Sequence, residues 1–243
     1  MAITYVSAFI DLQETREEGR TPLSRFHFFE ELASTGINLH LFLSYSYRGY
    51  YETVLGAREN VFVDYIELAD LATYADLRGL SYTVPPSENK VKDTANYHIV
   101  NNAKIEFVER AIKGARFNAD AYAWIDFSIG HMFRQPRETL AYLKGATYNE
   151  KGLVFPGCWP IHYGANELFT KISWRFCGSF FLGDRDSLLK FAELYRAKFR
   201  SIVKKMGILP WEVNVWHYLE LHEGFAPRWF SADHDDSIVR FVG

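Results

Sequence analysis

The stretch ADAYAWIDFSIGHMFR, residues 119–134, decides the fold. Its residues 121–125 form a short apolar run with aromatic members and no charge, which predicts a fully buried strand. The strand ends at Asp126, and small residues such as Ser128 follow. Ligands of open α/β sheets bind outside the carboxyl ends of the strands, so a carboxylate here suits a hard cation or a ribose hydroxyl. The alternative is a loop aspartate that caps the next turn.

Length and composition restrict the class of protein. The chain has 243 residues, of which 48% are hydrophobic, enough for one large domain or two small ones. A net charge of -3 gives no electrostatic argument for binding nucleic acid or an anionic membrane. Aromatic residues make up 17% of the chain, and such rings either bind sugars and bases or, more commonly, pack in the core.

Cysteine usage and the first residues predict the compartment. Cys158 and Cys177 are the two cysteines, too few for a disulfide framework, which points to a reduced compartment. The opening MAITYVSAFIDL lacks the basic flank of a signal peptide and the roughly 20 apolar residues of a membrane span. We therefore expect a soluble, cytoplasmic protein.

Strand and helix patterns alternate along the first third of the chain. The predicted elements are strands over 3–10, 38–44 and 61–66, and a helix that opens at Ser24 and stops at Thr35-Gly36. This order is typical of a parallel α/β unit. Arg20 and Arg25 flank the start of the helix, where they would form either a phosphate or carboxylate clamp or a solvated surface pair.

The rest of the chain continues the alternation. After an irregular segment over 67–97, the pattern predicts helices over 100–113, 137–143 and from Ser187 to Met206, a strand with a loop over 152–164, a strand over 172–182, a helix that starts at Pro210, and a tail loop over 225–236.

Lys104 is the most unusual residue of the predicted helix over 100–113. It falls inside the apolar arc that Ile105, Phe107 and Val108 help to form. A lysine on a buried face must either snorkel to the edge or find a carboxylate or phosphate. One helix, one turn and one strand separate Lys104 from Asp126, which places the two side chains at the same level of the fold.

Glu212 carries a second charge on an inward-facing stripe. It shares one helix face with Val215, Trp216 and Leu219 at i, i+3, i+4 and i+7. A carboxylate there is either a general base or hydroxyl ligand, or a partner of the helix dipole in the first turn.

Five segments in this order and spacing resemble the HtrL/YibB family of glycosyltransferases, within the broader GT-A class. They are TYVSAFIDL (4–12), NNAKIEFVERA (101–111), AWIDFSIGH (123–131), CGSFFLGDRDSLLKF (177–191) and WEVNVWHYLE (211–220). The resemblance implies a single GT-A-like α/β domain with a central mixed, mostly parallel sheet flanked by helices. Residues 1–135 would form its nucleotide-sugar-binding half, and residues 136–243 its acceptor-binding half.

The resemblance also implies the functional residues. A nucleotide-diphosphate sugar would bind against the first half of the sheet, and Mn²⁺ or Mg²⁺ would bind a DXD-like turn that reads Asp126-Phe127-Ser128 here. The expected roles are donor binding by Ser7, Phe9, Asp11, Arg20, Lys104, Asp126 and Ser128, metal binding by Asp126 and His234, acceptor binding by Trp174 and Trp211, and catalysis by Glu212.

The function expected from these residues is transfer of a sugar to a glycan or other hydroxyl acceptor, in surface-glycan biosynthesis. Two alternatives remain. A sugar-phosphate nucleotidyltransferase would normally show a glycine- and arginine-rich loop after its first strand, and residues 11–20 hold a weak version of it. A non-catalytic glycan-binding protein would explain the aromatic residues, but not Lys104 and Glu212 on inward faces.

Overall fold

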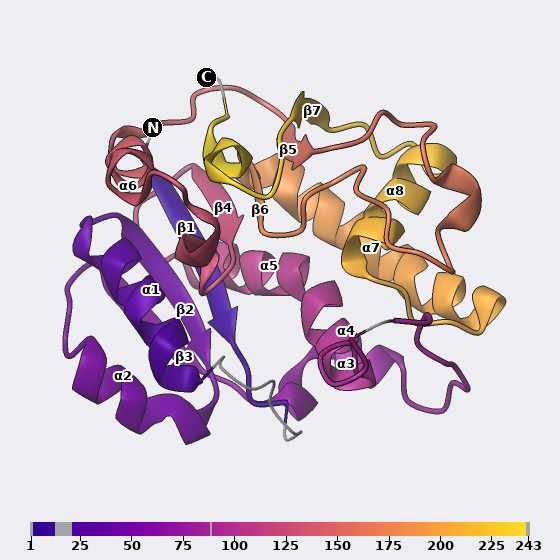
Figure 1. The fold of residues 1–243 in the computed structure, drawn as a ribbon, viewed down its shortest axis with the longest axis horizontal. Helices are drawn as coiled ribbons and strands as arrows, with labels where there is room; N and C mark the ends of the chain where they lie inside the picture. The colour runs from indigo at the N-terminus through magenta and orange to yellow at the C-terminus, as the bar shows by residue number, and fades with distance from the viewer. Residues whose placement is uncertain (1, 13–20, 88, 242–243) are drawn as a thin grey trace.

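In the computed structural model, which describes residues 2–12, 21–87 and 89–241, a seven-stranded sheet forms the centre of the fold (Figure 1). Its spatial order is β3-β2-β1-β4-β6-β5-β7. The strands are β1 (Ile3–Phe9), β2 (Asn38–Leu43), β3 (Val61–Tyr65), β4 (Ala121–Ile125), β5 (Leu153–Gly157), β6 (Phe180–Asp184) and β7 (Arg228–Ser231).

The strand pairing brings the carboxyl ends of β3, β2, β1 and β4 to one edge of the sheet. β1 pairs in parallel with β2 and with β4, and β2 pairs in parallel with β3. β6 runs antiparallel to both β4 and β5, and β7 is parallel to β5. The sheet is therefore mixed but mostly parallel, as predicted, and the ends of β1 and β4 lie side by side.

Helices cover both faces of the sheet, as the buried strand β4 requires. Trp124 belongs to the apolar cluster that contains residues of α5, α7 and α8, whereas Ala123 and Ile125 belong to the opposite cluster with residues of α1 and α6. The helices are α1 (Pro22–Ser34), α2 (Arg48–Val54), α3 (Ala72–Asp76), α4 (Ala95–Asn102), α5 (Lys104–Gly114), α6 (Pro136–Gly145), α7 (Arg185–Met206) and α8 (Glu212–His222).

Short 3-10 turns join these elements: η1 (Tyr45–Tyr47), η2 (Leu68–Asp70), η3 (Ile129–Met132), η4 (Ala165–Glu167) and η5 (Asp236–Val239). Figure 1 shows α1 and α2 on the side of β1 to β3, and α7 and α8 on the other side of the molecule. None of the helices that the structure describes is long and apolar enough to cross a membrane.

Several predicted boundaries were wrong, and four of them have a clear consequence for the fold. The helix expected over 100–113 is two helices, because Ala103 leaves the helical conformation at φ -87° and ψ 0°. Helix α7 begins before Ser187, because the Asp184 side chain accepts hydrogen bonds from the amides of the first turn. The strand expected over 172–182 is confined to β6, and the tail expected as a loop contains β7.

Candidate active site

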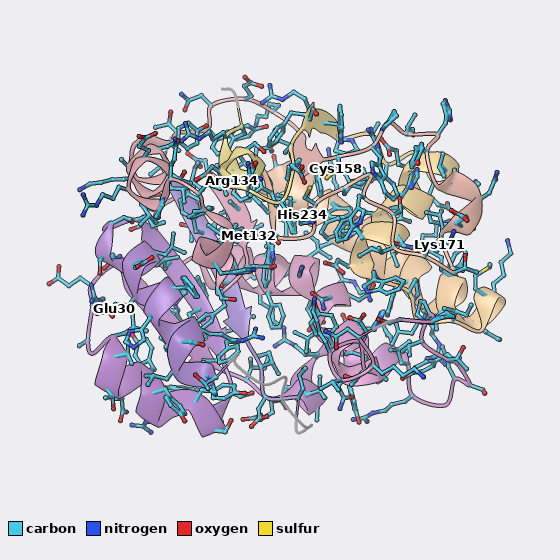
Figure 2. The ribbon with its side chains drawn as sticks, in the orientation of Figure 1. Glu30, Met132, Arg134, Cys158, Lys171 and His234 are labelled. Carbon is cyan, nitrogen blue, oxygen red and sulfur yellow. The ribbon has the colours of Figure 1, made fainter. Side chains whose placement is uncertain are left out.

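A cavity of about 890 Å³ opens at the carboxyl ends of β1 and β4. The cavity is lined at the strand ends by residues 8–12 and 126–128. The start of α5 and residues 211–213 close its base, and residues 170–172 and 174 form another wall. Met132, Lys171 and His234, which Figure 2 labels, reach it from three separate segments. This is the edge at which open α/β sheets bind their ligands.

Lys104 connects two carboxylates at the base of the cavity. Its ammonium nitrogen Nζ lies 2.7 Å from Oε1 of Glu212 and 3.3 Å from Oδ1 of Asp126, and it donates a 3.0 Å hydrogen bond to the carbonyl oxygen of Gly178. The prediction that Lys104 and Asp126 lie at the same level is therefore confirmed. Lys104 therefore makes two hydrogen bonds, to Glu212 and to Gly178, and a longer ion pair with Asp126.

The charge of Lys104 is stabilised by its neighbours. Burial alone would lower the pKa of Lys104, but the carboxylates of Asp126 and Glu212 outweigh burial and hold that pKa above its ordinary value. The indole ring of Trp124, whose centroid lies 5.7 Å from Nζ, adds a cation–π contact. Lys104 therefore does not snorkel, and the three ionised groups together carry a net charge of -1.

Asp126 is held by side-chain contacts and does not cap the following turn. Its Oδ1 accepts a 2.7 Å hydrogen bond from the indole Nε1 of Trp124, and its amide donates to the carbonyl oxygen of Ser179. The backbone carbonyl of Asp126, rather than its carboxylate, accepts the turn hydrogen bond from Ile129. About a third of its side chain is exposed, and Oδ2 makes no hydrogen bond to any described residue.

Glu212 occupies the first position of α8 and lies inside the protein, as its stripe predicted. It is 6% exposed and lines the cavity. Oε1 binds Lys104, whereas Oε2 accepts no hydrogen bond from the described part of the chain. The close approach depends on Gly178, because a Cβ atom at residue 178 would lie 2.2 Å from Oε1 of Glu212.

The other predicted residues divide into three groups. Phe9, Asp11, Ser128, Trp174, Trp211 and His234 all line the cavity. Ser7 does not line the cavity, because it is fully buried in β1. The prediction that Ser7 contacts the sugar donor is therefore corrected. Arg20 lies outside the described residues.

His234 has different neighbours from those expected of a ligand that shares a metal with Asp126. The described His, Cys, Asp and Glu side chains that could jointly hold a metal are Cys158, Cys177 and His234, and Asp126 is not among them. The imidazole of His234 also packs edge-on against Trp174, with 4.3 Å between the ring centroids.

The sequence analysis missed several cavity residues, among them Lys92, Trp159 and Lys171. Lys171 is paired with Glu167 at 2.8 Å. Lys92 places its ammonium 5.2 Å from the ring centroid of Tyr97 and forms no ion pair with the described residues. Both lysines follow irregular segments, where hydrophobic periodicity carries no signal.

The fold is similar to that of a solved glycosyltransferase. The crystal structure of mouse xyloside xylosyltransferase 1 in its apo form superimposes with a TM-score of 0.50 at 10% identity, covering 96% of this chain and 86% of that one. A glycosyltransferase involved in glycosylation of the major capsid of PBCV-1 gives a TM-score of 0.46 at 10% identity, with 96% and 82% covered. At such identities the likeness concerns the fold, which is GT-A-like.

No curated protein matches the chain. The family described as "Bacterial protein of unknown function (HtrL_YibB)" matches residues 83–208. This match spans Lys104, Asp126, Cys158 and Cys177 and covers slightly more than half of the sequence. The chain therefore belongs to the HtrL_YibB family.

Proposed function

We propose that this chain is a GT-A-type glycosyltransferase that moves a sugar from a nucleoside-diphosphate sugar to a hydroxyl group of a glycan or other acceptor, in surface-glycan biosynthesis. The observation that carries the proposal is the ion-paired group of Asp126, Lys104 and Glu212 at the base of the cavity. In this proposal residues 1–135 bind the donor and residues 136–243 bind the acceptor.

The oxygen ligands that Asp126 and its neighbour offer fit a divalent cation that the substrate helps to bind. Oδ2 of Asp126 and the hydroxyl of Ser128 are hard oxygen donors on the cavity wall. Mg²⁺ commonly binds through one or two carboxylates together with substrate phosphates and water, so a complete protein cage is unnecessary. A bound Mg²⁺ or Mn²⁺ would neutralise charge on the diphosphate leaving group. The net charge of -1 at the base of the cavity favours such a cation.

We assign Lys104 a positioning role instead of the phosphate contact first expected. Its ammonium group already donates hydrogen bonds to Glu212 and Gly178 and forms an ion pair with Asp126, so a phosphate would have to compete with these contacts. Lys92 is better suited to the diphosphate, because it lines the cavity and no described carboxylate neutralises it.

Glu212 is the candidate general base. Lys104 fixes its Oε1, which leaves Oε2 to accept a proton from an acceptor hydroxyl if the reaction inverts the sugar. If the reaction retains the configuration, the same oxygen would position the acceptor. Trp174 and Trp211 lie on the cavity wall, where their rings would contact the acceptor sugar.

Calorimetry with a panel of nucleoside diphosphates, with and without Mn²⁺, tests the proposal. We expect metal-dependent binding that Asp126→Asn abolishes in a chain that still folds, because Glu212 still pairs with Lys104. Asp120→Asn is a matched control, because Asp120 is exposed just before the amino end of β4.

Three results would contradict the proposal. They are binding of glycans by a chain that binds no nucleotide, formation of a sugar nucleotide from a nucleoside triphosphate, and unchanged Mn²⁺-dependent nucleotide binding by Asp126→Asn. The first would indicate a glycan-binding protein, and the second a nucleotidyltransferase.

A further inference from the structure

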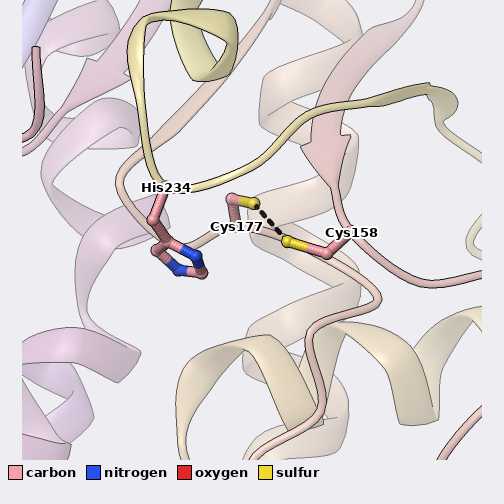
Figure 3. A group of neighbouring side chains, drawn as sticks. All are labelled: Cys158, Cys177 and His234. Atoms are coloured by element: carbon pink, nitrogen blue, oxygen red, sulfur yellow. Dashed lines mark hydrogen bonds between the residues drawn. The ribbon is translucent and has the colours of Figure 1, made fainter. Parts of the chain in front are cut away.

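Cys158, Cys177 and His234 form a cluster that the proposed transfer reaction does not use (Figure 3). His234 lines the cavity, whereas the two cysteines do not. One ligand atom from each residue lies within 4.8 Å of the other two. Cys158 follows β5, Cys177 precedes β6, and His234 follows β7, so the cluster joins three segments that are distant in the sequence.

We propose that these three side chains bind a thiophilic divalent metal ion, Zn²⁺, in a Cys₂His site separate from Asp126. Thiolate and imidazole ligands select zinc, whereas Mg²⁺ and Mn²⁺ prefer the oxygen ligands that Asp126 and Ser128 offer. The proposal does not depend on the transfer reaction, because neither donor nor acceptor takes part in it.

The spacing of the sulfurs fits this metal. The Sγ atoms of Cys158 and Cys177 are 3.7 Å apart. Two sulfurs that each bind a tetrahedral zinc at about 2.3 Å are separated by about 3.8 Å. A disulfide would require about 2.0 Å, so the two cysteines are not joined by one. One thiol donates a hydrogen bond to the other, at a distance that is also close to the separation of two zinc ligands.

The backbone fixes the two cysteines in this position. The amide of Cys158 donates to the carbonyl oxygen of Trp174 at 2.9 Å, and the amide of Cys177 donates to that of Pro156 at 2.8 Å. Gly157 makes this approach possible, since a Cβ atom there would lie 1.8 Å from the carbonyl oxygen of Arg175. The sulfur spacing is therefore a consequence of rigid backbone contacts.

The segment of the third ligand is tied to the same loop. The amide of Ala232 donates to the carbonyl oxygen of Gly157 at 2.9 Å. Nδ1 of His234 lies 3.5 Å from the carboxylate of Asp233, which adds negative charge beside the cluster. Carboxylates commonly accompany histidines that bind zinc. His234 is exposed, which gives a cation access from solvent.

The site would order one wall of the cavity. Trp159 directly follows Cys158, Trp174 packs against His234, and both tryptophans line the cavity. Three protein ligands also leave a fourth tetrahedral position for water. Binding of Zn²⁺ would therefore hold the wall that carries Trp174.

Metal binding can be measured on the reduced full-length chain without any substrate. We expect one equivalent of Zn²⁺ per chain by elemental analysis, a higher melting temperature with Zn²⁺, and protection of both thiols from alkylation. Co²⁺ should produce a thiolate-to-metal charge-transfer band. Mg²⁺ should produce none of these effects. These readouts need no variant, so they remain decisive if a variant fails to fold.

Variants then test the ligands. Cys158→Ser, Cys177→Ser and His234→Ala should each weaken Zn²⁺ binding at least about tenfold, because a metal ligand should matter no less than an outer-shell partner. His222→Ala, a histidine outside the cluster, should bind as the wild type does. The proposal is overturned if the reduced wild type binds no Zn²⁺ or if the ligand variants retain wild-type affinity. Formation of an intramolecular disulfide in a chain that binds no Zn²⁺ would instead make the cysteine pair a redox site.

Discussion

A Cβ atom at Gly178 would lie 2.2 Å from Oε1 of Glu212, so the ion pair of Glu212 with Lys104 requires glycine at residue 178. Gly178→Ala should push the Glu212 side chain away from Lys104 and lower the free energy of unfolding by about 1–3 kcal/mol. Turnover of a donor and acceptor pair should fall with it. Denaturant unfolding and a transfer assay measure the two effects.

Gly49→Ala is the matched control, because a Cβ atom there meets no atom within 4 Å and Gly49 lies within helix α2. This variant should be as stable as the wild type or more stable. Equal stability of Gly178→Ala and Gly49→Ala would show that residue 178 tolerates a side chain and that Glu212 is not held as described.

Lys104→Met should be strongly destabilising. It removes the cation and leaves the carboxylate of Glu212 buried without its partner, and breaking a buried ion pair in this way costs about 3–5 kcal/mol. Adding Glu212→Gln should recover part of this loss, because the second substitution removes the uncompensated charge. Urea unfolding of the wild type, both single variants and the double variant gives the coupling energy.

Lys113→Met provides the comparison for a lysine that is exposed. Lys113 binds Glu109 at 2.8 Å on the same helix, and Glu109 keeps Arg196 at 2.9 Å when Lys113 is removed, so the substitution should cost less than about 1 kcal/mol. If Lys104→Met proved as stable as Lys113→Met, the charge of Lys104 would be dispensable, and a snorkelling lysine would explain its position.

Lys104, Glu212 and Asp126 could be identified from the sequence, whereas the cysteine cluster could not. Lys104 and Glu212 interrupt helical apolar patterns, and Asp126 ends an uncharged strand, so local periodicity identified all three. Parallel β1 and β4 then determine where the strand ends meet. The orientation of Lys104 toward two carboxylates was not predictable, because it depends on the loop that carries Gly178.

Cys158, Cys177 and His234 have no such pattern. The two cysteines are 19 positions apart, and the histidine follows much later, so the three residues form no short metal-binding motif. Loop contacts alone bring them together. The same loop explains the failed strand prediction over 172–182, because Cys177 and Gly178 precede β6 in a turn that passes the base of the cavity.

Lys92→Met should weaken nucleoside-diphosphate binding about tenfold or more, because a hydrogen bond to a charged group contributes about 1.5–3 kcal/mol. Lys92 lines the cavity, whereas the nearby Lys90 is exposed and does not. Lys90→Met is therefore the control and should bind as the wild type does. Calorimetry on both variants decides whether Lys92 contacts the diphosphate, and equal affinities would exclude it.

Asp184 should make the stability of the fold depend on pH in the acid range. Burial alone would raise the pKa of Asp184, but hydrogen bonds from Ser187 and Gly152 outweigh burial and lower that pKa below its ordinary value. The stabilisation is therefore complete above the unfolded-state value of about 3.9 and is lost as pH falls through the folded-state value. Unfolding of the wild type by urea should become easier across this window.

Asp184→Ala should lower the free energy of unfolding by about 1–3 kcal/mol at neutral pH, because α7 loses its N-cap and the amide of Gly152 loses its acceptor. Its acid sensitivity should be smaller than that of the wild type. Asp186→Ala removes an exposed carboxylate in the same turn and should cost less than about 1 kcal/mol. An unchanged pH profile in Asp184→Ala would assign the acid sensitivity to other groups.

Glu212→Gln tests the catalytic step itself. Glutamine is nearly isosteric and keeps a hydrogen-bond acceptor, but it cannot take the proton of an acceptor hydroxyl. Donor binding by calorimetry should stay intact, while turnover should fall by about 10²-fold or more. The 2.7 Å contact of Oε1 with Lys104 predicts a second effect, some loss of stability, so turnover must be measured well below the melting temperature of the variant.

Glu220→Gln is the control. Glu220 lies on the same helix, pairs with Arg175 and does not line the cavity, so the turnover of this variant should resemble that of the wild type. Transfer at the wild-type rate by Glu212→Gln would remove Glu212 from the mechanism and leave it the structural partner of Lys104.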